Sequence, residues 1–172
     1  NNFTGNISGS SGDTGWIEVD SASDLGTGAK TADFSASASS GLGGIRLLGN
    51  ITVSDVALNI AGRNVDAATQ HVLLNVSGNN KWTGNINIVN SGGTYYLRSE
   101  SGRLELSGTL SNAQAANLTA DTRAFNFEGP GDFLVSGTIA TGANSNRFTA
   151  LVIDGTGTTT LTGTNTYTGS TA

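Results

Sequence analysis

Five glycines recur along this 172-residue chain at nearly constant intervals, and each follows an aliphatic residue by two positions. The glycines are Gly49, Gly78, Gly108, Gly137 and Gly163, and the aliphatic residues are Leu47, Val76, Leu106, Val135 and Leu161. Successive glycines are 29, 30, 29 and 26 residues apart (49 to 78, 78 to 108, 108 to 137 and 137 to 163). Such a period is typical of a solenoid, in which each repeat covers the apolar face of its neighbour. The spacing therefore predicts stacked coils of roughly 29 residues.

A second column of inward-facing residues is expected two positions before the first one. Its members are Ile45, Leu74, Leu104, Phe133 and Thr159. Side chains of a strand point alternately to its two faces, so the residues between the two columns should face solvent. Four of these five intervening residues are polar or charged, which fits a wall that is wet outside and dry within. We expect the five aliphatic residues to form the structural core of the repeat, with about 4.8 Å between neighbours.

Each coil is expected to contain three strands. The interval that starts at Gly78 shows this best, because it contains three short apolar runs separated by turn-forming residues. The runs are 86–88, 95–97 and 104–106. The sequence thus predicts an all-β chain, a parallel β-helix of about six coils that forms one domain over residues 1–172. An antiparallel β-sandwich would explain the short strands equally well, but it would not explain the constant period.

The composition supports ordered β structure and excludes several functions. Charged residues make up only 12% of the chain, while 36% of the residues are hydrophobic and are spread over short alternating runs. The absence of cysteine excludes disulfides, thiolate catalysis and cysteine-ligated zinc. The net charge of −5 and the lack of a Lys/Arg run argue against a nucleic-acid partner. No apolar run approaches the length of about 18 residues that a transmembrane helix needs, so we expect no membrane insertion of this segment.

The residues with catalytic or metal-binding chemistry are few. His71 is the only histidine, and we expect it to flank a strand at or near the surface. Glu18 and Asp20 are the only acidic pair with the spacing of one strand face, and a structural role is the simpler interpretation. Glycine pairs such as Gly155 and Gly157 lack the Lys-Ser/Thr pair and the following helix of a phosphate loop. We therefore expect no catalytic residue, no cofactor, no metal site and no enzymatic activity.

Four charged residues of alternating sign surround one expected turn. They are Arg98, Glu100, Arg103 and Glu105. Solvated charges on strands are common and discourage side-by-side association of sheets, so this is the interpretation that we prefer to a ligand patch.

The stretch Ile153–Gly169, IDGTGTTTLTGTNTYTG, repeats phrases found earlier in the chain. Its middle reappears as VSG at 76–78 and 135–137, and its ending as NKWTG at 80–84 and NNFTG at 1–5. These residues resemble the autotransporter-associated β-strand repeat of large bacterial surface passengers, which has the form G-x-G-x-L-x-L-x-G-x-N-x-Y-x-G. The likeness covers the last 20 or so residues and the copy at 76–84. It implies a secreted, right-handed parallel β-helix.

Three aromatic residues share the slot Asn-x-aromatic-Thr-Gly, namely Phe3, Trp82 and Tyr167. Aromatic rings in a repeated slot could stack on sugars, with the neighbouring Asn and Thr side chains as hydrogen-bond partners. Packing over a corner of the coil is the simpler interpretation. Carbohydrate stacking by these three residues is the alternative that we retain, with surface glycans as the corresponding ligands.

The resemblance implies a structural segment of an extracellular bacterial surface protein, either secreted or anchored in the outer membrane. Such a stalk would extend or display another part of an adhesin or fibre. The alternatives are a carbohydrate-binding or carbohydrate-active β-helix and a self-assembling extracellular filament subunit. Because positions 1 and 165 occupy the same point of the motif, we expect the chain to be part of a longer repetitive polypeptide. Its partners would be neighbouring coils of that polypeptide or other copies stacked end to end. Asn1-Asn2-Phe3 does not open a signal peptide, so an export signal is expected outside this sequence.

Overall fold

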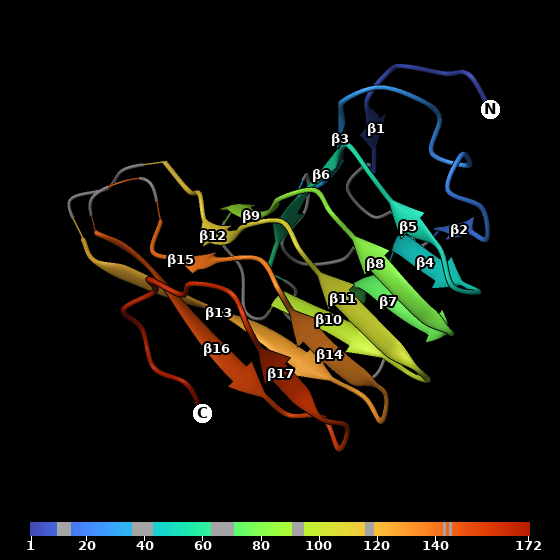
Figure 1. Cartoon of the computed structure of the whole chain (residues 1–172). Coiled ribbons are helices and arrows are strands. Elements are labelled where there is room, and N and C mark those ends of the chain that lie inside the picture. Colours follow the sequence, from blue (N-terminus) through green and yellow to red (C-terminus); the bar gives the residue numbers. More distant parts are fainter. Residues whose placement is uncertain are drawn as a thin grey trace.

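The structure is a computed structural model, and it describes residues 1–9, 15–35, 43–62, 71–90, 95–115, 119–142, 144 and 146–172. Within these residues the chain forms 17 strands and no helix. Every paired strand runs parallel to its neighbours, and from β3 (Lys30–Phe34) onward successive strands belong to three sheets in turn. Figure 1 shows the chain advancing along one axis, from the blue N-terminal strands at the upper right to the red C-terminal strands at the lower left. The protein is a β-solenoid, which confirms the predicted fold class.

The three sheets take one strand each from most coils. Sheet A contains β1 (Ile7–Ser8), β3 (Lys30–Phe34), β6 (Val56–Ala61), β9 (Ile86–Asn90), β12 (Leu110–Asn112) and β15 (Ile139–Ala140). Sheet B contains β2 (Trp16–Val19), β4 (Gly44–Leu48), β7 (His71–Ser77), β10 (Tyr95–Ser99), β13 (Asp121–Glu128) and β16 (Arg147–Ile153). Sheet C contains β5 (Thr52–Val53), β8 (Asn79–Trp82), β11 (Arg103–Leu106), β14 (Asp132–Val135) and β17 (Thr159–Leu161).

The coils are fewer and shorter than the glycine spacing predicts. The solenoid has about five turns, with strands of neighbouring coils about 26 residues apart. Individual coils differ in length: Leu104 pairs with Asn80, 24 residues earlier, and with Phe133, 29 residues later. The regular element is therefore the stacking of strands and not the number of residues in a coil.

The corner between sheets A and B accounts for much of this variation. Connections from sheet C to sheet A have two or three residues, for example 54–55 and 83–85. Connections from sheet B to sheet C have one to five, the shortest being Gly78 alone. Connections from sheet A to sheet B range from four residues (91–94) to nine (35–43 and 62–70). Two corners are thus tight, and the third accommodates insertions.

The glycines line both tight corners, so the single row of five that the sequence suggests is wrong. The connections from sheet B to sheet C hold Gly49, Gly78, Gly102, Gly129, Gly131, Gly155 and Gly157, and those from sheet C to sheet A hold Gly84, Gly108 and Gly137, while Gly163 follows β17. At Gly137 an added Cβ would collide with the carbonyl oxygen of Gly108, and at Gly108 with that of Gly84. Glycine is required there because only a residue without a side chain allows the coils to approach so closely.

The sequence does not distinguish the two corners, because at each of them an aliphatic residue is followed by one further residue and then by a glycine. One short coil separates Gly84 from Gly108, which is 24 residues. The offset from Gly78 at one corner to Gly84 at the next adds 6 residues, and the resulting interval of 30 from Gly78 to Gly108 imitates one full coil.

The aliphatic column requires the same correction. Leu106 pairs with Val135, and Val135 pairs with Leu161, but the strands before them contribute other residues. The interior column of sheet C is Val53, Trp82, Leu106, Val135 and Leu161. Leu47 and Val76 lie in sheet B, on β4 and β7, and Leu47 pairs there with Asn75. Leu161 is also 37% exposed and is not part of the buried core.

The second predicted column changes in a similar way. Leu104, Phe133 and Thr159 are in register in sheet C, and the preceding residue of this column is Asn80. Ile45 and Leu74 belong to sheet B instead, where Ile45 pairs with Leu73, not with Leu74. Sheet B has a register shift between Leu47 and Leu48 that a regular two-residue alternation does not predict.

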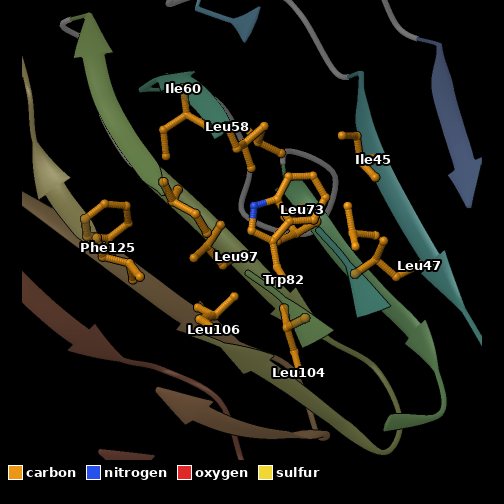
Figure 2. Packing of buried hydrophobic residues seen from close by; sticks show 14 of the residues in the cluster. Ile45, Leu47, Leu58, Ile60, Leu73, Trp82, Leu97, Leu104, Leu106 and Phe125 are labelled. Carbon is orange, nitrogen blue, oxygen red and sulfur yellow. The ribbon is translucent and has the colours of Figure 1, made fainter. Parts of the chain in front are cut away.

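The core runs through the interior of all three sheets as one cluster of buried apolar side chains. Its largest fully buried members are Trp82, Tyr95, Phe125 and Phe127. Phe127 stacks on Phe133 of the next strand in sequence, with 4.7 Å between the ring centroids and 9° between the ring planes. Figure 2 shows side chains from different sheets, such as Leu73, Leu97 and Leu106, pointing into the same interior space.

Polar side chains replace apolar ones at several points of this interior, one of them next to the corner between sheets B and C. Asn75, Asn80 and Ser99 are buried next to the corner between sheets B and C. The Asn75 amide nitrogen donates to Ser99 Oγ (3.0 Å) and to the carbonyl oxygen of Ser101 (2.9 Å). Asn80 donates to the amide oxygen of Asn75 and accepts from the backbone nitrogen of Ile51 (2.8 Å). The buried amides therefore satisfy one another and the backbone groups that turn inward at this corner.

Leu106→Asp tests the interior column of sheet C. Leu106 is 1% exposed between Trp82 and Val135, so the substitution buries a charge without a partner. We expect it to lower the free energy of unfolding by on the order of 4 kcal/mol. Urea denaturation followed by circular dichroism measures this loss. Leu161→Asp is the matched control, because it changes the same residue type in the same column at an exposed position and should cost much less. Equal losses for the two variants would contradict the assigned column.

Candidate functional site

Trp82 does not lie on the surface, so the sugar-stacking alternative retained for the aromatic slot is wrong at this position. Its side chain is 0% exposed in β8. Figure 2 shows its indole ring among the buried leucines, near Leu73, Leu97 and Leu104. Because the ring is fully buried, Trp82 acts as a packing residue and cannot stack on a sugar at the surface. Its Asn-x-aromatic-Thr-Gly motif places the aromatic ring inside the coil because position 82 belongs to the interior column of sheet C.

The other two aromatic residues lie in different surroundings. Phe3 is 39% exposed, and the Lys30 ammonium sits 4.5 Å from the centroid of its ring. Lys30 also donates to the carbonyl oxygens of Leu25 (2.7 Å) and Phe3 (3.1 Å), so it fixes this ring to the following coil. Tyr167 is half-buried against the core, and its hydroxyl lies 2.6 Å from Thr171 Oγ1. The three aromatic residues thus do not share one environment.

Glu18 on β2 and Asp20, just after β2, have different partners. Glu18 points to Arg46 of the next coil, with 3.4 Å between Oε1 and Nη1. The Asp20 backbone nitrogen donates to the carboxylate of Asp24, which also accepts from the Ser21 nitrogen. The hydrogen bond from the Ser21 backbone nitrogen has the largest effect in lowering the pKa of Asp24, and the one from Asp20 has the next largest. Glu18 is therefore part of a contact between coils and Asp20 part of a turn, and the two do not converge on one site.

The four alternating charges are divided between two sheets. Arg98 and Glu100 are paired at the end of β10, with 2.5 Å between Nε and Oε1. Glu105 lies on β11 and pairs with Lys81 of the preceding coil (2.8 Å), while Ser136 of the following coil donates to it (2.8 Å). The Lys81 contact, followed by that of Ser136, lowers the pKa of Glu105. Arg103 is exposed at the start of β11.

His71 and Glu128 form the least expected group, because sequence reasoning placed His71 at a strand flank and gave Glu128 no role. Both side chains are buried, each 4% exposed, and Nε2 of His71 lies 3.3 Å from Oε2 of Glu128. Arg98 approaches the same carboxylate oxygen with 3.6 Å from Nη1, and the Tyr96 ring meets the imidazole edge-on at 6.3 Å between centroids. Desolvation raises the pKa of Glu128, Asp154 adds to the increase and Arg98 opposes it.

A second polar group surrounds the corner between sheets A and B. Asp121 accepts from Arg123 Nε (2.9 Å) and from Arg147 Nη1 (2.8 Å), so one carboxylate joins two strands of neighbouring coils. Tyr95 lies on β10, and its hydroxyl donates to the carbonyl oxygen of Asn90 (3.1 Å). Burial raises the pKa of Tyr95 to about 12. These groups are paired with one another in a way that stabilises the corner.

No three histidine, aspartate or glutamate side chains within the described ranges are grouped so that they could hold a metal ion. None of the same residues belongs to a helix that is long and apolar enough to cross a membrane. Comparison with protein-family models, with curated proteins and with solved structures finds no match to this chain.

Tryptophan fluorescence tests the position of Trp82, because the chain contains only two tryptophans. Trp16 is partly exposed on β2, and Trp16→Phe leaves Trp82 as the only indole. Since Trp82 is fully buried, we expect the variant to emit at short wavelength and to resist quenching by iodide. The native protein, in which Trp16 remains, should be quenched in part. Strong iodide quenching of the folded Trp16→Phe variant would place Trp82 on the surface and contradict its assignment to the core.

Proposed function

We propose that this chain is a structural segment of an extracellular bacterial surface protein, a β-solenoid stalk of the autotransporter passenger type. The observation that carries the proposal is that the charged side chains described above join neighbouring coils. Glu18 pairs with Arg46, Lys81 with Glu105, and Asp121 with Arg147, each across adjacent strands of one sheet. Charges used in this way hold a stack of coils together, which is what a stalk requires.

The backbone supports the same role. Parallel strands that are hydrogen-bonded from coil to coil make a stack whose repeats contact only their neighbours, and such a stack can be extended without changing its cross-section. The extracellular, surface-anchored or secreted location is proposed from the G-x-G-x-L-x-L-x-G-x-N-x-Y-x-G resemblance of Ile153–Gly169. In this role the segment would be noncatalytic and would display another part of an adhesin or fibre.

Neighbouring coils of the same polypeptide, or other copies stacked end to end, are the partners proposed for such a segment. The carbohydrate-binding and carbohydrate-active alternatives depended on a shared aromatic slot and on an acidic pair. The burial of Trp82 and the separate partners of Glu18 and Asp20 favour the stalk over these alternatives.

A display experiment tests the stalk. The chain is inserted between an outer-membrane anchor and a terminal epitope on bacterial cells, and epitope labelling is measured before and after trypsin treatment. We expect labelling to survive trypsin, because buried backbone in closely stacked coils is a poor protease substrate. The same insertion with Leu106→Asp is the matched control and should lose its epitope. Loss of the epitope at equal rates in both strains would show that the chain does not act as a protease-resistant stalk.

A further inference from the structure

The contact between His71 and Glu128 joins strands that are not neighbours. In sheet B, β10 lies between β7 and β13, so this contact spans two strand spacings of about 4.8 Å each. Glu128 pairs in register with Arg98, next to the interior residue Phe127, and therefore stands on the outer side of the sheet. Despite this, both His71 and Glu128 are more than nine-tenths buried. Their contact ties three successive coils together on the outer side of sheet B.

Charged groups of both signs surround the contact between His71 and Glu128. Glu128 faces Arg98 on β10 and His71 on β7, and the charge of Asp154, which follows β16, also acts on it. Arg98 is shared, because its Nε lies 2.5 Å from Glu100. Tyr96 also faces the pair, with its ring edge-on to the imidazole. The burial of the Glu128 carboxylate and the nearby charge of Asp154 both favour the uptake of a proton by this contact.

We propose that His71 and Glu128 form a pH-sensitive clamp, which takes up one proton on acidification and then holds the three coils more tightly. The proton either charges His71, which gives an ion pair, or neutralises Glu128, which gives a neutral hydrogen bond. Both arrangements remove the cost of a buried carboxylate that Arg98 alone compensates only in part. The two groups titrate as a pair, so the proton belongs to the contact and not to one residue.

The direction of the effect follows from linkage. The pKa of Glu128 is raised in the folded protein, first because of desolvation and second because of Asp154. A folded state that binds a proton more tightly than the unfolded state gains stability in acid. The contribution of Glu128 to the free energy of unfolding is therefore complete below the ordinary glutamate pKa. It is lost as the pH rises through the raised pKa of the folded protein. The contribution of Glu105 to stability depends on pH in the opposite direction. Its pKa is lowered in the folded protein, so its contribution is lost in acid.

The clamp can be tested with the native chain, since His71 is its only histidine and gives one set of imidazole signals in NMR. The ring titration and the urea unfolding curve are measured between pH 5 and pH 8 for the native protein, Glu128→Gln and Glu100→Gln. Where the proton charges His71, its midpoint should be lower in Glu128→Gln, as for the loss of one close opposite charge, and where the proton neutralises Glu128 the midpoint should be unchanged. Relative to Glu128→Gln, the native protein should become more stable on acidification. Glu100→Gln, which contacts Arg98 but not His71, should behave like the native protein in both measurements.

Parallel stability curves for the native protein and Glu128→Gln would overturn the clamp. Hydrogen exchange of the native protein gives a second test that needs no variant. Corrected for the intrinsic exchange rate, the protection of amides in β7, β10 and β13 should increase from pH 8 to pH 5 relative to that in sheet A. A protection difference that stays constant or decreases would likewise exclude the clamp.

Discussion

Backbone hydrogen bonds between successive coils are the interaction on which the rest of this structure depends. They run along three sheets, and they hold each residue over its counterpart in the coils before and after it at a spacing of about 4.8 Å. A side chain is therefore selected by its neighbours one coil away and much less by its neighbours in sequence. Leu106 fits between Trp82 and Val135, and Glu105 lies beside Lys81, because of this stacking.

The tight corners show the same constraint in its strictest form. At the corner between sheets C and A, the carbonyl oxygen of one coil occupies the space that a Cβ of the next would need, so glycine is repeated at Gly84, Gly108 and Gly137. The corner between sheets B and C instead brings backbone polar groups toward the interior, where Asn75 and Asn80 bind them. The corner between sheets A and B has longer connections and is the place where coils change length without disturbing the stack.

The general fold can be predicted from the sequence because alternation and a near-constant period are both local signals. Parallel strands, three per coil, follow from the short apolar runs and are what the structure shows. The register cannot be obtained in this way. Two corners of each coil carry the same aliphatic-x-glycine motif. The interval from Gly78 to Gly108 therefore contains one short coil plus the residues between those two corners. A phrase that occurs at two points of each coil cannot distinguish them without knowledge of which strands pair.

The side-chain groups are even less accessible to sequence reasoning. Glu128 lies 57 residues after His71, and their contact requires the lengths of two complete coils to be known. The burial of Trp82 depends on the same register, because its motif is shared with Phe3, which is exposed. Glu18 and Asp20 are only two positions apart in the sequence, yet they contact different partners. In a solenoid, side chains that contact one another come from successive coils stacked along the axis. A sequence motif lies within one coil and does not contain them.

Electron-spin distance measurement tests the stacking most directly, and the absence of cysteine allows unique labelling of introduced pairs. One outward row of sheet A is Ser8, Asp33, Asn59, Asn87, Ser111 and Ala140. With one label fixed at Ala140→Cys, the second is placed at Asn59→Cys, Asp33→Cys or Ser8→Cys. The account predicts distances of about 14, 19 and 24 Å, which increase by one strand spacing for each added coil. Distances that do not increase with the number of coils would contradict the parallel stacking on which this account depends.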